Sequence, residues 1–140
     1  MPRPSAVLDT NIIISAHLSP DGLERHVLDL ALNRRIQIFY SDAVFAEYEE
    51  VLGRPKFHIA TAKRTESLRL IRAAGKRVVP KMRVRKAIDS DDDMFLECAE
   101  QARAQYLVTG NKRHFPASWQ STRVVNTREF ISQIFDELRR

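Results

Sequence analysis

Short apolar runs alternate along the chain with longer stretches in which apolar residues recur every three or four positions. The short runs predict strands at residues 5–8, 36–40, 78–79, 106–109 and 122–125. The longer periodic stretches predict helices that begin after residue 11 and near residue 127, and helices over residues 23–33, 41–53, 61–74 and 91–105. Strands and helices therefore alternate from one end of the chain to the other.

Polar residues, glycine and proline mark where several of these elements begin and end. Ser41 and Asp42 are suited to cap the start of a helix, and Gly53 and Pro55 are suited to end it. Thr127 is predicted to cap the last helix in the same way.

This alternation predicts an α/β fold, a three-layer α/β/α sandwich whose central, mostly parallel sheet has about four or five strands. Functional sites in such sheets lie beyond the carboxyl ends of the strands. Asp9 follows the first predicted strand directly, and Asn111 follows the strand at 106–109 by two residues. We therefore expect both side chains to face one crevice. No repeat or linker interrupts the pattern, so residues 1–140 are predicted to form a single domain.

The composition indicates what kind of core this domain has and in which cellular compartment it is expected. With 44% hydrophobic residues the chain can bury a core without cross-links. Its one cysteine, Cys98, excludes an internal disulfide and lies in an apolar helical stretch, which favours a buried thiol and a reducing cytoplasm. No apolar run is long enough to span a bilayer, and no signal peptide is recognisable, so no membrane partner is expected.

Charge adds a plausible partner. The formal net charge is +5, which makes a polyanion such as nucleic acid a reasonable ligand. A basic cluster comes just before an acidic run: Lys76, Arg77, Lys81, Arg83, Arg85 and Lys86 precede Asp89, Asp91, Asp92 and Asp93. A basic rim beside an acidic centre suits a site that cleaves phosphodiesters, although a solvated charged loop explains the same pattern equally well.

Three acids are candidates for chemistry. Asp9 ends an apolar strand, where a carboxylate is costly to bury unless it caps a helix or binds a cation. Glu47 lies on a helix and Asp92 at the start of another, where a solvated position and a cap or dipole role are the respective alternatives. Four acids within positions 89–93 repel one another, and this crowding favours a hard divalent cation such as Mg²⁺.

Four segments of the chain together resemble the PIN-domain family, and within it the VapC-like toxins of bacterial toxin–antitoxin pairs. The segments occur in the family's order: Val7-Leu8-Asp9-Thr10-Asn11, then Ser41 to Glu47, then Asp92 to Ala99, and finally Tyr106-Leu107-Val108-Thr109-Gly110-Asn111. Each motif is weak alone, but four in register within one short chain form a specific signal. The resemblance implies a metal-dependent endoribonuclease that hydrolyses RNA phosphodiester bonds.

The resemblance also implies a set of site residues. Asp9, Glu47 and Asp92 match the family's metal-binding carboxylates for Mg²⁺ or Mn²⁺, with Thr10 and Asn11 as supporting polar groups. Where the family often has a fourth acid, this chain has Asn111, whose amide oxygen still suits a metal or its water. The same turn supplies candidate contacts to substrate phosphates, namely Lys112, Arg113 and His114. A cognate antitoxin protein and a homodimer are the further partners that the resemblance implies.

Two other functions fit parts of the same pattern. A phosphatase or receiver-like domain also places an aspartate after its first strand, but a haloacid-dehalogenase-like phosphatase needs a second aspartate where this chain has Asn11. A catalytically weak or inactive PIN domain that binds RNA or protein is the stronger alternative, because the fourth acid is missing. Aromatic and histidine residues without a distinctive spacing are left outside the site: Tyr48, Phe57, Trp119, His17, His26 and His58.

Overall fold

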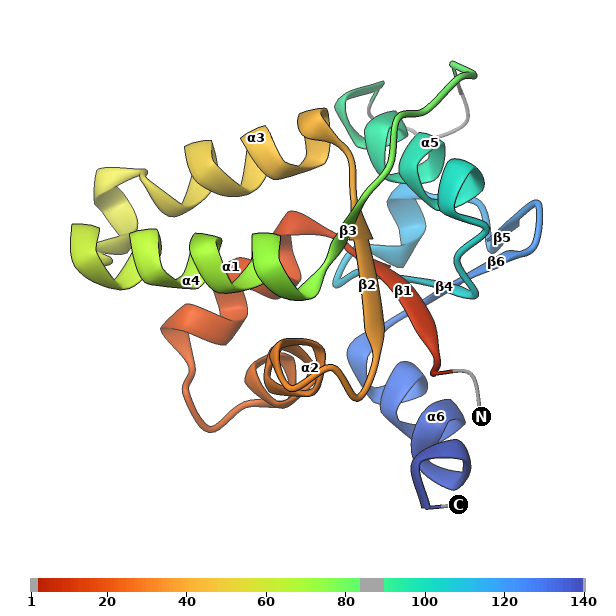
Figure 1. Cartoon of the computed structure of the whole chain (residues 1–140), viewed down its shortest axis with the longest axis horizontal. Helices are drawn as coiled ribbons and strands as arrows, with labels where there is room; N and C mark the ends of the chain where they lie inside the picture. The colour runs from red at the N-terminus through yellow and green to blue at the C-terminus, as the bar shows by residue number, and fades with distance from the viewer. Residues whose placement is uncertain (1–2, 84–89, 140) are drawn as a thin grey trace.

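A sheet of six strands runs through the centre of the protein (Figure 1). The computed structural model describes residues 3–83 and 90–139. In spatial order the strands of the sheet are β3 (Lys76–Arg77), β2 (Gln37–Tyr40), β1 (Ser5–Leu8), β4 (Tyr106–Val108), β6 (Thr122–Val125) and β5 (Ser118–Trp119). All neighbouring pairs are parallel except β5 and β6.

In the described part of the chain, six α-helices flank this sheet: α1 (Thr10–Leu18), α2 (Leu23–Leu32), α3 (Asp42–Leu52), α4 (Thr61–Ala74), α5 (Asp93–Ala102) and α6 (Thr127–Arg139). Three short 3₁₀ turns accompany them: η1 (Pro55–Phe57), η2 (Ser90–Asp92) and η3 (Lys112–His114). Helix α5 packs on β1, β2 and β4, on the other side of the sheet from α1, α2 and α4 (Figure 1). Helix α6 packs against α2 and β4. The predicted PIN-like α/β architecture is confirmed.

The order of the strands locates a crevice. From β1 the chain passes to β2 and then β3 on one side, and afterwards returns to β4 on the other side of β1. Ligands of open α/β sheets bind where the strand order reverses in this way, beyond the carboxyl ends of the two diverging strands. Those ends are here Leu8 and Val108, which are aligned in the sheet register. The residues that follow them, Asp9 and Thr109, are both buried and stand at the edge where this crevice is expected.

The central strand explains why its sequence is an unbroken apolar run. Ala6, Val7 and Leu8 of β1 are completely buried because helices cover both faces of the sheet. The first polar side chain after them, that of Asp9, is still 94% buried, since it is only 6% exposed. The core thus continues up to the edge where the candidate chemistry begins.

The predicted number of strands was too low, and one strand was misplaced. The strand predicted at residues 78–79 lies at Lys76–Arg77, where β3 pairs with Phe39 and Tyr40. Strand β5 was not predicted, because it has only two residues and shows no periodicity. It forms a tight hairpin with β6 through Gln120, which has a positive φ of 53°. Such a turn is usually signalled by glycine or asparagine, and the sequence has neither at this position.

Two predicted helix boundaries also need correction. Helix α5 ends at Ala102 and not at residue 105, because Arg103 takes a left-handed φ of 52° and the N–H of Ala104 bonds back to the carbonyl of Ala99. Asn126, and not Thr127, caps α6: its side-chain oxygen accepts from the Glu129 N–H at 2.8 Å. The predicted Ser41 cap is confirmed, since its hydroxyl accepts from the Val44 N–H at 3.2 Å.

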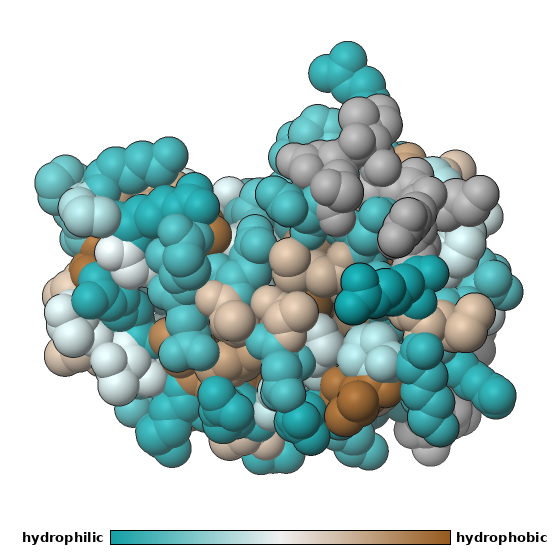
Figure 2. All heavy atoms as spheres, turned by 90° about the horizontal axis from the view of Figure 1, so that it is seen from above, coloured by the Kyte–Doolittle hydropathy of each residue, from teal (hydrophilic) through white to brown (hydrophobic). Residues whose placement is uncertain are grey.

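The outer surface is mainly hydrophilic on the face seen in Figure 2, where apolar patches are small and separated. Within the described residues, no helix is long and apolar enough to cross a membrane. The predicted buried thiol is confirmed, because Cys98 is fully buried and burial raises its pKa to about 12. Arg85 and Lys86 of the predicted basic cluster, and Asp89 of the acidic run, lie outside the described residues.

Candidate active site

Asp9 is fixed at the start of the crevice by its strand neighbours. Its backbone N–H donates to the carbonyl of Val108 at 2.9 Å, and the Thr109 hydroxyl donates to its carboxylate at 2.7 Å. Burial raises the pKa of Asp9, while Thr109 and the nearby N–H groups of Thr10 and Asn11 oppose this rise. The carboxylate makes no helix-cap hydrogen bond to α1. Asp9 thus stands at the N-cap position of α1, but the hydrogen bond that orients its carboxylate comes from Thr109 and not from the helix.

Glu47 reaches the same neighbourhood from the second turn of α3. Its side chain is half-buried, and its pKa is raised, first by burial and next by repulsion from Asp92. Repulsion from Glu47 also contributes to the raised pKa of Asp9. The Thr10 hydroxyl opposes the shift at Glu47, although this buried oxygen completes no hydrogen bond among the described residues. Glu47 thus interacts electrostatically with both other acids.

Asp92 is the last residue of η2 and stands directly before α5. It makes no side-chain cap hydrogen bond to that helix, so the predicted alternative of a capping role is not observed. Its carboxylate lies 3.6 Å from Nδ1 of His114, a distance that becomes an ion pair when the imidazole is protonated. Asp9, Glu47 and Asp92 thus come from three separate segments, and electrostatic interactions link Glu47 to each of the other two acids.

Two residues that the sequence did not place in the site support its floor. Tyr48 is fully buried, and its hydroxyl donates a short hydrogen bond to the carbonyl of Leu8, the residue before Asp9. Thr109 is also fully buried and orients the Asp9 carboxylate. A polar residue that ends a buried strand was a usable signal for Thr109. No spacing distinguished Tyr48 from the other aromatic residues.

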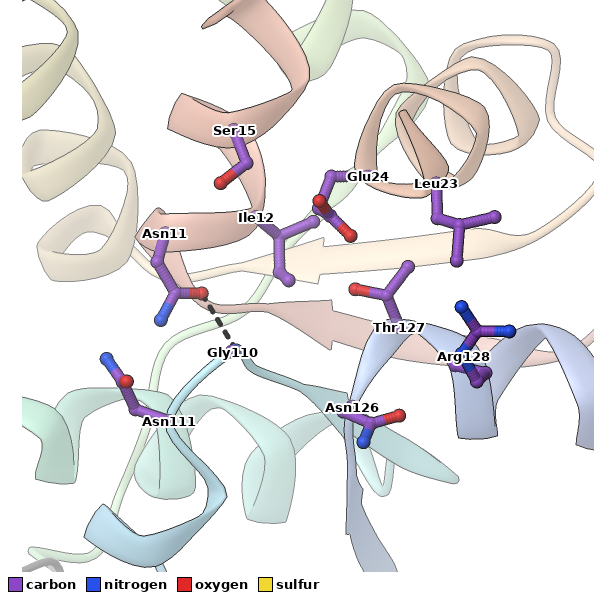
Figure 3. A pocket seen from close by; sticks show the side chains of 10 residues that line it. All are labelled: Asn11, Ile12, Ser15, Leu23, Glu24, Gly110, Asn111, Asn126, Thr127 and Arg128. Carbon is purple, nitrogen blue, oxygen red and sulfur yellow. Dashed lines mark hydrogen bonds between the residues drawn. The ribbon is translucent and has the colours of Figure 1, made fainter. Parts of the chain in front are cut away.

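The turn after β4 brings the predicted polar residues beside the acids. The Asn11 side-chain oxygen accepts from the Gly110 N–H at 3.1 Å, and the Asn111 N–H donates to the Thr109 hydroxyl at 3.0 Å. Asn11, Gly110 and Asn111 line one side of a pocket of about 470 Å³ (Figure 3). The start of α1 and the turn after β4 thus form one continuous wall.

The predicted phosphate contacts occupy the outer part of this turn. Lys112, Arg113 and His114 line a second pocket of about 540 Å³. Glu129 holds the Lys112 ammonium at 2.8 Å and 3.0 Å, which offsets part of its charge. In the part of the chain that the structure describes, Arg113 has no ion-pair partner. Arg113 is therefore the stronger candidate for contact with a substrate phosphate.

The oxygen donors at this edge have the chemistry that Mg²⁺ and Mn²⁺ select. Asp9, Glu47 and Asp92 offer carboxylates, and the buried Thr10 hydroxyl is an oxygen without a completed hydrogen bond. Yet over residues 3–83 and 90–139 no three acid, histidine or cysteine side chains are close enough together to form a metal-binding group. The carboxylate and hydroxyl oxygens are of the kind that binds Mg²⁺ or Mn²⁺. To bind one ion together, the three carboxylates would have to move closer to one another against their mutual repulsion.

A parallel α/β sheet with acids at its strand-order reversal defines the class of protein, and comparison with known families specifies it. The profile described as PIN domain matches residues 5–113, so the chain belongs to the PIN domain family. Members of this family are typically metal-dependent nucleases.

One protein sequence and one solved structure are similar to this chain. An uncharacterized protein of Methanocaldococcus jannaschii, MJ1680, is 28% identical over 109 residues, which cover 76% of this chain and 70% of that protein. The crystal structure of PAE2754 from Pyrobaculum aerophilum aligns with a TM-score of 0.61 over 96% of this chain and 90% of that one. Its sequence identity is 13%, so this similarity concerns the fold alone.

Proposed function

We propose that this protein is a Mg²⁺- or Mn²⁺-dependent endoribonuclease that hydrolyses RNA phosphodiester bonds. The observation that carries the proposal is the electrostatic coupling of Glu47 to both Asp9 and Asp92, three acids that come from distant segments of the chain. Two of these acids have raised pKa values, and carboxyls with raised pKa values are more frequent at functional sites than at structural ones. The basic side chains beside them suit a polyanionic substrate.

Each part of the site has a distinct task in this proposal. Asp9 and Asp92 are direct ligands, and Glu47 is a ligand or a base that orients the attacking water. Thr109 fixes the orientation of Asp9. The metal ion, when bound, supplies positive charge that stabilises the negative charge developing on the phosphate.

The surrounding polar residues position the ion and the substrate. In this proposal Asn111 supplies an amide oxygen in place of the fourth acid, and Thr10 and Asn11 support the first acid. The side chain of Asn11 is itself held by the Gly110 N–H. The backbone of the substrate lies along the rim formed by Lys112, Arg113 and His114, which also line the second pocket. His114 can in addition form an ion pair with Asp92 when its ring is protonated, since the two side chains are 3.6 Å apart.

At a finer level, we assign the protein to the VapC-like toxins, acting in the cytoplasm as one domain over residues 1–140. A cognate antitoxin would then cover the crevice, and a homodimer would join two basic rims. A small reading frame next to the coding sequence, and co-purification of its product with this chain, would support this assignment. Cleavage of RNA without any such partner would separate the nuclease from the toxin role.

The deciding experiment compares cleavage of total RNA in Mn²⁺ by the native chain with cleavage by Asp9→Asn and Asp92→Asn. We expect each substitution to slow cleavage at least about 100-fold, because it removes a carboxylate from the side of the cation. Asp42→Asn is the matched control, since it makes the same change on an exposed residue. Equal cleavage by all four proteins would identify a contaminant and refute the assignment.

The alternative function is an RNA- or protein-binding module without turnover. It is favoured by Asn111, which stands where related domains often carry a fourth acid. Electrophoretic mobility shift of RNA in the presence of Mn²⁺, without shortening of the RNA, would support this alternative. Restoration of cleavage by Asn111→Asp would then show that the missing acid is the cause.

A further inference from the structure

The pocket beside the acids is built differently from the basic rim. Its upper wall comes from α1 and α2, and its lower wall from the turn after β4 and the start of α6 (Figure 3). Glu24 extends from α2 beside Ile12, and the Arg128 guanidinium rises from α6 beside Leu23 (Figure 3). With a volume of about 470 Å³, the pocket falls within the range of pockets that hold small organic ligands.

The charges of the two neighbouring pockets differ. The pocket of Figure 3 is lined by one acid, Glu24, and one base, Arg128, so its lining residues are formally neutral. The second pocket is lined by Lys112 and Arg113 and by no acid. The two pockets adjoin each other, because Gly110, Asn111 and Asn126 line both of them. A phosphate fits the basic pocket, whereas an uncharged base fits the neutral one.

Hydrogen bonds at the pocket wall determine which groups face a ligand. The side-chain oxygens of Asn11 and Asn126 already accept from the backbone N–H groups of Gly110 and Glu129. These bonds leave their NH₂ groups as the available donors. The Glu24 carboxylate is then the strong hydrogen-bond acceptor of the pocket, opposite the donors of Arg128. A ligand must therefore present donors on one edge and acceptors on another.

We propose that this pocket holds the guanine base of a single-stranded RNA next to the scissile phosphate, which deepens the proposed nuclease function and rests on it. Guanine carries N1–H and N2–H₂ side by side on its Watson–Crick edge, and this pair matches a carboxylate with two acceptor oxygens. Its O6 and N7 acceptors match an arginine fork. Adenine, cytosine and uracil lack two adjacent donors of this kind. Glu24 and Arg128 are thus the specificity-determining residues.

The test measures binding separately from cleavage. Fluorescein-labelled hexauridylate is compared with hexamers carrying one central guanosine, adenosine or cytidine, by anisotropy in EDTA so that no turnover occurs. We expect the guanosine hexamer to bind roughly tenfold more tightly than the others, the discrimination that one good bidentate pair gives. Glu24→Gln should remove this preference, and Glu100→Gln on α5, outside the pocket lining, should keep it.

The outcomes separate this inference from the nuclease function. Equal binding of all four hexamers to the native chain, or an equal gain for all of them in Glu24→Gln, would overturn the guanine pocket. The second result would mean that the carboxylate only repels the RNA backbone. Metal-dependent cleavage without base preference would leave the nuclease standing and refute the pocket. Guanosine preference without cleavage would support the pocket while the nuclease assignment fails.

Discussion

Two acids on the outer surface and two acids in the crevice have pKa values that are shifted in opposite directions. Asp42 accepts two hydrogen bonds from Arg77, at 2.7 Å and 2.6 Å, and these hold the pKa of its carboxyl below the usual value. Glu66 is held in the same way by Arg69. In the crevice, burial and like charges raise the pKa values of Asp9 and Glu47.

The difference separates structural charge from functional charge. An exposed ion pair adds little to stability and needs no further explanation. A buried carboxyl that is repelled by its neighbours costs stability, so a chain that only had to fold would gain by replacing it. The acids at the carboxyl edge are therefore best explained by a cation or a substrate that compensates their charge.

The largest expected effect concerns the metal. Mn²⁺ at about 100 times its dissociation constant should stabilise the native chain by about 2.7 kcal/mol, or roughly 10 °C in Tm for a chain of this size. Asp9→Asn should lose most of this stabilisation, because the crevice then carries one carboxylate fewer. Differential scanning calorimetry with and without Mn²⁺ measures both values.

A surface acid supplies the matched control for this titration. Asp42→Asn should retain the full shift in Tm, because Asp42 is paired with Arg77 outside the crevice. If Mn²⁺ stabilised Asp9→Asn as much as the native chain, the ion would bind elsewhere, and the crevice acids would lose their proposed explanation.

The second effect concerns the floor of the crevice. Tyr48→Phe should lower the free energy of unfolding by about 1–2 kcal/mol, because it leaves the buried Leu8 carbonyl without the tyrosine donor. Tyr40→Phe is the matched control: its hydroxyl donates to the Arg72 carbonyl at 3.1 Å in a less buried place, so its loss should cost less. Urea unfolding measures both, and the reverse order would contradict this role of Tyr48.

The sequence predicted the fold well where apolar pattern alone determines structure. Strands β1 and β6 were predicted with their observed bounds, β1 from its apolar residues and β6 from the β-branched residues Thr122, Val124 and Val125. The prediction from sequence was wrong at β5 and at the end of α5, where Gln120 and Arg103 adopt left-handed φ angles. Neither residue type signals such a turn, so only the packed structure reveals them.

For the candidate site, the sequence predicted which residues take part but not the hydrogen bonds between them. Asp9, Glu47 and Asp92 were predicted from the family resemblance, and their roles stay predictions. The hydrogen bond from Thr109 to Asp9 joins residues 100 positions apart, and that from Tyr48 to Leu8 joins residues 40 apart. Such pairings depend on the strand order of the sheet, which local patterns do not specify.

A smaller effect tests the cost of the crevice charge. In EDTA near neutral pH, Asp9→Asn should be more stable than the native chain by about 1 kcal/mol, because the amide keeps the Thr109 bond without a buried charge. Burial raises the folded pKa of Asp9 above the usual value of an aspartate. Ionisation therefore destabilises the native chain as pH rises from that usual value through the raised pKa. The advantage of the variant should therefore vanish in acid. Thermal unfolding of both proteins from pH 3 to 8 measures this difference in stability. A difference that stays constant with pH would contradict the prediction.

The smallest effect should have the opposite sign at neutral pH. The hydrogen bonds from Arg77 lower the pKa of Asp42, so its ionised form stabilises the fold at a pH above the usual pKa of an aspartate. This contribution is lost as pH falls through the lowered pKa. Asp42→Asn should thus be slightly less stable than the native chain near neutral pH, by about one degree in Tm or less, because water screens the exposed pair. The two variants differ only in where the same chemical change is made. Opposite signs would show that the location of a carboxylate, crevice or surface, decides whether its charge costs or adds stability; equal signs would remove that distinction.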